Sequence, residues 1–176
     1  MFLASFSLGI AQEEAPELDA LKVTATPFDK SSEDLAQPWY VIAEEELNRL
    51  MQATLGETLG WKPGVSSTSF TGGASRPIIR GHGGNRVRIL SNGLGTQDLS
   101  NSSPDHAITI DPLMVEQVEI LRGPATLLYG GAANGGAVNI IDGRMPSSLP
   151  TETSGGVSAG YIGASEGKYA SLKFDI

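Results

Sequence analysis

The chain of 176 residues has no cysteine, and it is poor in charged and aromatic residues. Without cysteine it can hold neither a disulfide nor a thiolate-ligated metal or iron–sulfur site. Charged residues make up 18% of the chain and aromatic residues 6%, whereas an average soluble domain has roughly 25% charged residues. The length suits one domain with a hydrophobic core and an appendage, and it is too short for two domains of ordinary size.

Glycine, in contrast, is abundant. The 22 glycines are one residue in eight, against an average of about 7%, and 14 of them lie in residues 61–150. This content predicts many turns and much irregular backbone in the middle of the chain.

The net charge of −8 is concentrated at the N-terminal end. Residues 1–60 hold 11 acidic and 3 basic side chains, whereas residues 61–150 hold 6 acidic and 7 basic ones. Binding to nucleic acid phosphates needs a basic face, so we expect no nucleic acid partner.

The N-terminal segment divides into two parts. Residues 1–11 are apolar and uncharged and end in a small-x-small pattern, as in the back half of a secretory signal peptide. The alternative is a buried terminal strand or helix, because a run of this length cannot span a bilayer. Residues 12–37 are acidic and polar, which predicts a mobile leader.

One stretch of this leader alternates between apolar and polar residues. Leu21, Val23 and Ala25 fall on one face, with Lys22 and Thr24 on the other, as in a strand that adds to the edge of a sheet. The alternative is an ordinary edge strand of the domain.

Short strands and helices alternate over residues 38–146, which we expect to form the folded body. A helix is predicted over residues 43–51, with three glutamates in its first turn. A second follows Thr54, which forms a capping box with Glu57. Strands are predicted at residues 38–42, 77–80, 86–90, 115–121 and 137–141. This mixture predicts an α+β fold with a small mixed β-sheet and short helices.

The last part of the chain, residues 151–176, has a different pattern. Residues 156–163 and 168–176 are two alternating segments of about nine residues, the span of a tilted transmembrane β-strand. The alternative is a hairpin packed on the domain. Because the second segment ends with the last residue, we expect the sequence to be truncated inside a strand.

Several motifs of the chain occur together in a known family. Over residues 35–145 the chain resembles the plug domain of TonB-dependent outer-membrane receptors, in order and in spacing; the motifs are residues 55–65, 77–81, 86–93, 115–124, 129–130 and 135–141. The resemblance implies a plug inside a β-barrel in the outer membrane of a Gram-negative cell, with the leader in the periplasm. It also implies that residues 151–176 are the first barrel strands.

The resemblance gives the leader a role as well. The alternating stretch is similar to a TonB box, a segment that pairs as a strand with the periplasmic energy-coupling protein TonB. The residues concerned are Leu21, Lys22, Val23, Thr24 and Ala25.

Two arginines are expected to hold the plug in place. Inside a barrel lumen, Arg80 and Arg122 would be buried against the wall, and a buried arginine is costly unless a carboxylate pairs with it. We therefore expect Arg80 and Arg122 to lock the plug to the barrel, without a role in ligand binding.

Asp105 and His106 are the candidate metal ligands, in the polar loop of residues 96–112. An imidazole and a carboxylate suit zinc or a similar divalent ion, but a closed site needs about four ligands, so barrel loops would complete it. The alternative is a turn in which Asp105 caps backbone amides after Pro104. His82 is expected to be structural.

The same loop is similar to the zinc-uptake branch of the family, where the plug's Asp-His pair binds metal. The residues that carry this likeness are Asp98, Ser100, residues 103–106, Asp111 and Pro112. The resemblance therefore favours energised uptake of a scarce metal or metal complex, with zinc first and haem, copper or a siderophore as alternatives.

Other classes of function are less well supported. The glycine loop of residues 130–136 lacks the Gly-Lys-Ser/Thr ending of a phosphate-binding loop, and there is no third histidine. We therefore expect no enzyme and no prosthetic group, with Zn²⁺ entering only as transported cargo. A soluble periplasmic plug-like binding module without a barrel is the remaining alternative.

Overall fold

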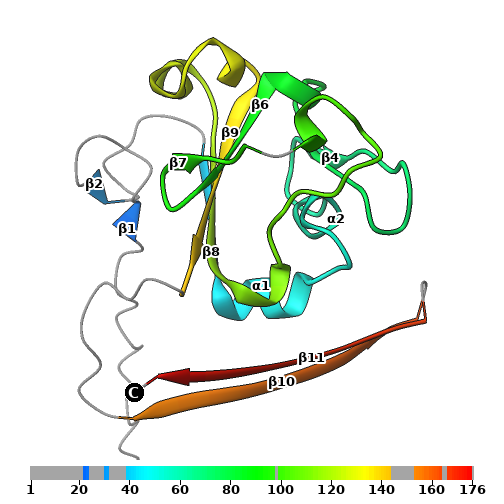
Figure 1. Ribbon diagram of the computed structural model, residues 1–176. Coiled ribbons are helices and arrows are strands. Elements are labelled where there is room, and N and C mark those ends of the chain that lie inside the picture. The colour runs from blue at the N-terminus through cyan, green and yellow to red at the C-terminus, as the bar shows by residue number, and fades with distance from the viewer. Residues whose placement is uncertain are drawn as a thin grey trace, which may run out of the picture.

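The chain folds around a five-stranded mixed sheet (Figure 1) with the strand order β3-β8-β9-β6-β7. The computed structural model describes residues 22–23, 30–31, 39–97, 99–143, 153–163 and 166–175. The strands are β3 (Trp39–Ala43), β6 (Val87–Ser91), β7 (Leu94–Gly95), β8 (Val115–Leu121) and β9 (Gly136–Asp142). Strand β9 runs parallel to β6, and the other neighbours are antiparallel. The predicted α+β class is confirmed.

Three two-stranded sheets and several short helices complete the described elements. The sheets pair β1 (Lys22–Val23) with β2 (Lys30–Ser31), β4 (Val65–Ser67) with β5 (Pro77–Ile79), and β10 (Ser154–Ile162) with β11 (Gly167–Asp175). The α-helices are α1 (Glu44–Leu50) and α2 (Leu55–Leu59), and the 3₁₀ helices are η2 (Gly84–Arg86), η3 (Leu99–Asn101), η4 (Pro112–Met114), η5 (Pro124–Tyr129) and η6 (Gly131–Ala133). Among the described elements, no helix is both long and apolar enough to cross a membrane.

The predicted elements lie close to their predicted places, and the differences concern short elements that the sequence pattern did not indicate. Thr54 caps α2 as predicted, by accepting a hydrogen bond from the Glu57 backbone N–H at 3.4 Å, and the helix ends at Leu59. The Gly60 N–H closes the last turn on the carbonyls of residues 56 and 57, and the chain then continues in turns up to Val65. A 3₁₀ helix, η6, lies within the predicted glycine loop, and the short strands β2, β4 and β7 were not predicted. The predicted signal peptide, residues 1–11, lies outside the described residues.

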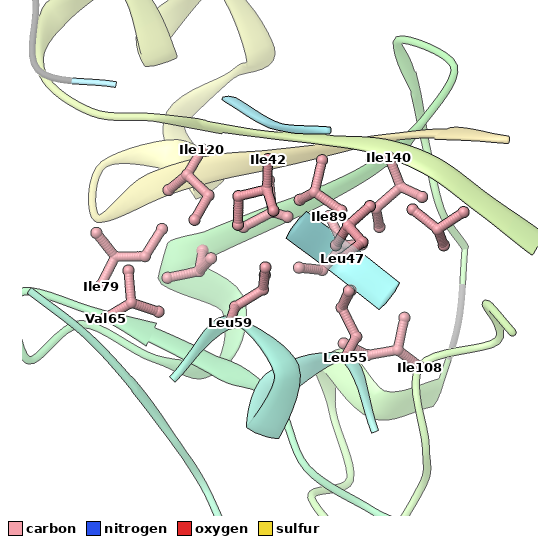
Figure 2. Packing of buried hydrophobic residues seen from close by; sticks show 14 residues of the cluster. Ile42, Leu47, Leu55, Leu59, Val65, Ile79, Ile89, Ile108, Ile120 and Ile140 are labelled. Atoms are coloured by element: carbon pink, nitrogen blue, oxygen red, sulfur yellow. The ribbon is translucent and has the colours of Figure 1, made fainter. Parts of the chain in front are cut away.

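The apolar core lies between one face of the sheet and the two α-helices (Figure 2). Alternate residues of β3, β6, β8 and β9 point toward the helices, and leucines on the buried sides of α1 and α2 pack against them. The labelled members include Ile42, Leu47, Leu55, Leu59, Ile89, Ile120 and Ile140. Full burial of each such side chain contributes about 1.5–3 kcal/mol. Ile108, from the candidate metal loop, enters the same cluster, so the loop is tied to the core.

The opposite face of the sheet centre is also buried, and there a polar pair lies beside a second, smaller apolar cluster of Leu90, Leu121 and Ala137. Glu119 of β8 and Asn139 of β9 are opposite each other and have no solvent exposure. The Glu119 carboxylate accepts hydrogen bonds from Asn139 Nδ2 and from Gln117 Nε2, each at 3.0 Å. Asn139 Oδ1 in turn accepts from the Gly93 N–H at 2.8 Å, which fixes the β6–β7 turn. Burial and, secondarily, the charge of Glu119 raise the pKa of the nearby Tyr129.

The β10–β11 hairpin separates apolar from polar side chains. Its register places Val157 opposite Leu172, so one face carries the larger apolar side chains, which are 61–79% exposed: Val157, Tyr161, Leu172 and Phe174. The other face carries Ser154, Ser158, Ser171 and Lys173, and also Tyr169. On that side Lys173 Nζ donates a hydrogen bond to Glu116 Oε1 of β8. The hairpin therefore has one uncovered apolar face in the described part of the chain.

Gly136 is the residue at which the sheet tolerates a side chain least. Its φ is +146°, and a Cβ there would lie 2.7 Å from Ile79 Cδ1 and 3.1 Å from the Leu121 carbonyl oxygen. Gly136→Ala should therefore lower the free energy of unfolding by about 2–4 kcal/mol through strain and overpacking. Gly131→Ala is the control, because a Cβ there meets nothing within 4 Å, and its effect should stay within about 0.5 kcal/mol. Equal losses for the two variants in denaturant titrations would contradict this packing.

Candidate functional site

The candidate metal ligands lie on an exposed turn between β7 and β8. The turn follows η3, and the His106 N–H closes it by donating to the Ser103 carbonyl at 3.2 Å. The structure describes this loop except for Asp98, so the likeness assigned to that residue lies outside the described residues.

Asp105 and His106 contact each other. His106 Nδ1 lies 3.0 Å from Asp105 Oδ1, and Ser103 Oγ donates to the same oxygen at 2.5 Å. The hydrogen bonds from Ser103 and then from His106 lower the pKa of Asp105. Because Nδ1 faces the carboxylate, Nε2 is the nitrogen left for a metal, and Asp105 would orient the ring. Asp105 thus accepts from side chains here, rather than only capping the turn.

The turn does not form a closed metal site by itself. Within the ranges that the structure describes, no group of three or more His, Cys, Asp or Glu side chains is placed to hold a metal ion. Asp111 is engaged elsewhere, since its Oδ1 accepts from the Leu113 N–H at 3.0 Å and caps η4. A metal at His106 would need its remaining ligands from outside the described residues, and their supply by barrel loops stays a prediction.

Arg76 is a residue of the site that the sequence did not single out. It is 3% exposed, and its Nη2 donates to Asn101 Oδ1 at 2.8 Å while Nη1 donates to Ser100 Oγ. Both acceptors belong to η3, at the start of the candidate loop. The partners are 24 and 25 residues away in sequence, so no local pattern signals this contact.

Arg122 is buried inside the domain. Its guanidinium carbon lies 4.6 Å from the centroid of the Tyr40 ring, and Nη2 donates to the Pro63 carbonyl at 2.8 Å. Its Nε is buried and has no hydrogen-bond partner among the residues that the structure describes. Lys62, which also approaches the Tyr40 ring, pairs with Glu46 at 2.5 Å. Arg122 thus joins the ends of β3 and β8 to the segment after α2.

Arg80, the second expected locking residue, has a different environment. It is exposed and follows β5 with a φ of +50°, and its backbone N–H donates to the Gly64 carbonyl at 2.9 Å. Locking requires a complete barrel, so the role of Arg80 and Arg122 toward a barrel stays a prediction.

The expected TonB box and His82 are the remaining residues that the sequence singled out. Lys22 and Val23, in the middle of the expected TonB box, form β1, whereas Leu21, Thr24 and Ala25 lie outside the described residues. His82 is exposed in the turn after β5, where its backbone exchanges two hydrogen bonds of 2.9 Å with Ile79. A Cβ at Gly135 would lie 2.5 Å from the His82 Cβ, so this turn packs closely on the glycine loop.

Comparison with known proteins adds the following similarities. The family model described as "TonB-dependent Receptor Plug Domain" matches residues 31–137. The chain is 30% identical over 145 residues to the vitamin B12 transporter BtuB of Photobacterium profundum, covering 81% of this chain and 24% of the transporter.

Solved structures show the same likeness. The siderophore receptor PirA of Pseudomonas aeruginosa is 31% identical with a TM-score of 0.51, over 72% of this chain and 21% of the receptor. The ferric enterobactin receptor of the same organism is 26% identical with a TM-score of 0.59, over 80% and 22%. The chain therefore spans about a quarter of the length of these relatives.

The burial of Arg122 makes its substitution costly within this domain. Arg122→Ala should lower the free energy of unfolding by about 2–4 kcal/mol, because it removes a charge-assisted hydrogen bond and a cation–π contact. Arg80→Ala is the control, since Arg80 is exposed, and it should change that free energy by less than about 0.5 kcal/mol.

Urea-release and proteolysis assays on a full-length receptor separate this internal role from locking. If Arg80 locks the plug, Arg80→Ala eases release of the plug without changing the stability of the domain. A plug that Arg80→Ala and Arg122→Ala release no more easily than wild type would rule out locking by these arginines.

Proposed function

We propose a transport function for this chain, which belongs to the TonB-dependent receptor plug domain family: the family model covers residues 31–137, more than half of the chain. Members of this family are outer-membrane receptors with the plug inside the barrel, as the sequence predicted for this chain. The relatives are transporters and receptors, so the expectation that the chain is not an enzyme is also confirmed. The protein to which the chain belongs would import a scarce metal or metal complex.

The C-terminal hairpin supports the membrane part of this proposal. Strands β10 and β11 have nine residues each, which is the span of a tilted strand across a bilayer. Their exposed apolar face has Tyr161 near one end and Phe174 near the other, as in barrel strands with aromatic girdles. In water this face would favour aggregation. It therefore argues against a soluble periplasmic module without a barrel.

The exposed Asp105–His106 pair is the main observation in favour of a substrate that contains a metal. It offers His106 Nε2 to an incoming metal, with Asp105 holding the opposite ring nitrogen. A zinc ion bound in this way, with further ligands from the barrel, is the first version of the proposal. Zinc would be cargo, and no prosthetic group is required.

A preformed metal complex is the second version of the proposal. The relatives are named for vitamin B12, siderophores and ferric enterobactin, and a complexed metal already has its ligands. Such a substrate, or haem or complexed copper, would contact the plug through its organic surface and would not need a free imidazole nitrogen.

Energy for either version would come from the TonB protein in the periplasm. The leader would offer residues 21–25 as a strand for pairing, a mode in which main-chain hydrogen bonds supply the affinity. Strand β1 lies within this stretch and supports that role.

Calorimetry on the full-length receptor distinguishes the two versions. ZnCl₂, CuCl₂, haem and ferric enterobactin are titrated into wild type, His106→Ala and, as a matched control, His82→Ala. If zinc is the substrate, His106→Ala weakens zinc binding by about tenfold or more, and His82→Ala leaves it unchanged. Unchanged zinc affinity in His106→Ala would refute the metal site. Tight binding of a complex by all three proteins would support the second version.

A further inference from the structure

We infer that Arg76 is a positioning residue for the substrate turn, residues 103–106, an inference that rests on the proposed function. Arg76 lies directly before β5 and is 3% exposed. An arginine is rarely buried to this extent unless its hydrogen bonds are satisfied. Two hydrogen bonds of the Arg76 guanidinium are directed at the loop that carries Asp105 and His106.

The backbone of Arg76 is fixed to the base of the β4–β5 hairpin. Its N–H donates to Thr68 Oγ1 at 2.8 Å, and its carbonyl accepts from the Thr68 N–H at 2.9 Å. The preceding residue, Ser75, shares a hydrogen bond of 2.5 Å with Thr54, the cap of α2. The backbone of Arg76 is therefore fixed by hydrogen bonds, and only its side chain extends to the loop.

The guanidinium of Arg76 holds η3 through two neighbouring acceptors. Nη2 donates to Asn101 Oδ1 at 2.8 Å, and Nη1 donates to Ser100 Oγ. Ser100 is itself 2% exposed. Because the guanidinium is a planar fork, it fixes the orientation of η3 as well as its position, which a lysine ammonium would not do.

Two hydrogen bonds connect η3, which Arg76 holds, to the candidate metal ligands Asp105 and His106. The Ser103 N–H donates to the Leu99 carbonyl of η3 at 2.9 Å, and Ser103 Oγ then donates to Asp105 Oδ1 at 2.5 Å. Beyond His106, the core residue Ile108 anchors the other side of the loop. The turn is thus exposed between two buried anchors, so a substrate does not have to order it on binding.

Spin labelling tests this role directly, because the 176 residues contain no cysteine to interfere. In a full-length receptor without other cysteines, a nitroxide is attached to Ser102→Cys, within the exposed loop, or to Asn134→Cys, on the exposed end of η6. Arg76→Met should shorten the rotational correlation time of the label at 102 severalfold and leave the label at 134 unchanged. Arg76→Lys should give an intermediate value.

Equal mobility at position 102 in wild type and Arg76→Met would overturn the inference. So would equal mobilisation of both labels, which is the result of a general loss of structure. If Arg76→Met fails to fold, the acceptors supply the test: Ser100→Ala combined with Asn101→Ala should mobilise the label at 102 with Arg76 intact.

Binding of ZnCl₂ links the anchor to function. With the turn released, the dissociation constant for zinc should rise about tenfold, the factor expected for one lost charge-assisted hydrogen bond. A mobilised turn with unchanged zinc affinity would contradict a positioning role. If the wild-type receptor binds no zinc, the zinc version of the proposed function fails, whereas the two labels still decide whether Arg76 holds the turn.

Discussion

The antiparallel pair β8 and β9 is the constraint on which the rest of the structure depends. These strands are buried on both faces, with isoleucines against the helices on one side and the Glu119–Asn139 pair on the other. A buried carboxylate is tolerated only when its hydrogen bonds are made. The position of β8 relative to β9 is therefore fixed by both faces at once.

The candidate functional residues lie at the ends of this central pair. Arg122 follows β8 and fastens the first strand, β3, through Tyr40. The loop that leads into β8 presents Asp105 and His106, and Ile108 and Arg76 hold it against the body. A rigid centre with exposed loops at its ends is the arrangement expected of a domain that must recognise a substrate without unfolding.

The sequence predicted the elements better than the contacts between them. Alternation over residues 115–121 gave β8 with its bounds, and Thr54 was recognised as a cap, because both signals are local. Two contacts join residues 20 or more positions apart: the hydrogen bonds of Arg76 to η3 and the Glu119–Asn139 pair. No periodic pattern in the sequence indicates contacts of this kind. Arg122 was expected to need a partner outside the domain, but an aromatic face and a carbonyl supply contacts within it.

Metal accumulation in intact cells tests the central claim, that this chain is the plug of an energised importer. Cells expressing the full-length receptor would be analysed by mass spectrometry with and without the TonB protein, and with Val23→Pro, which removes a backbone donor from β1. Accumulation is expected to require TonB, and Val23→Pro should abolish it while surface binding persists. Accumulation that is independent of both TonB and Val23 would contradict energised import through this plug.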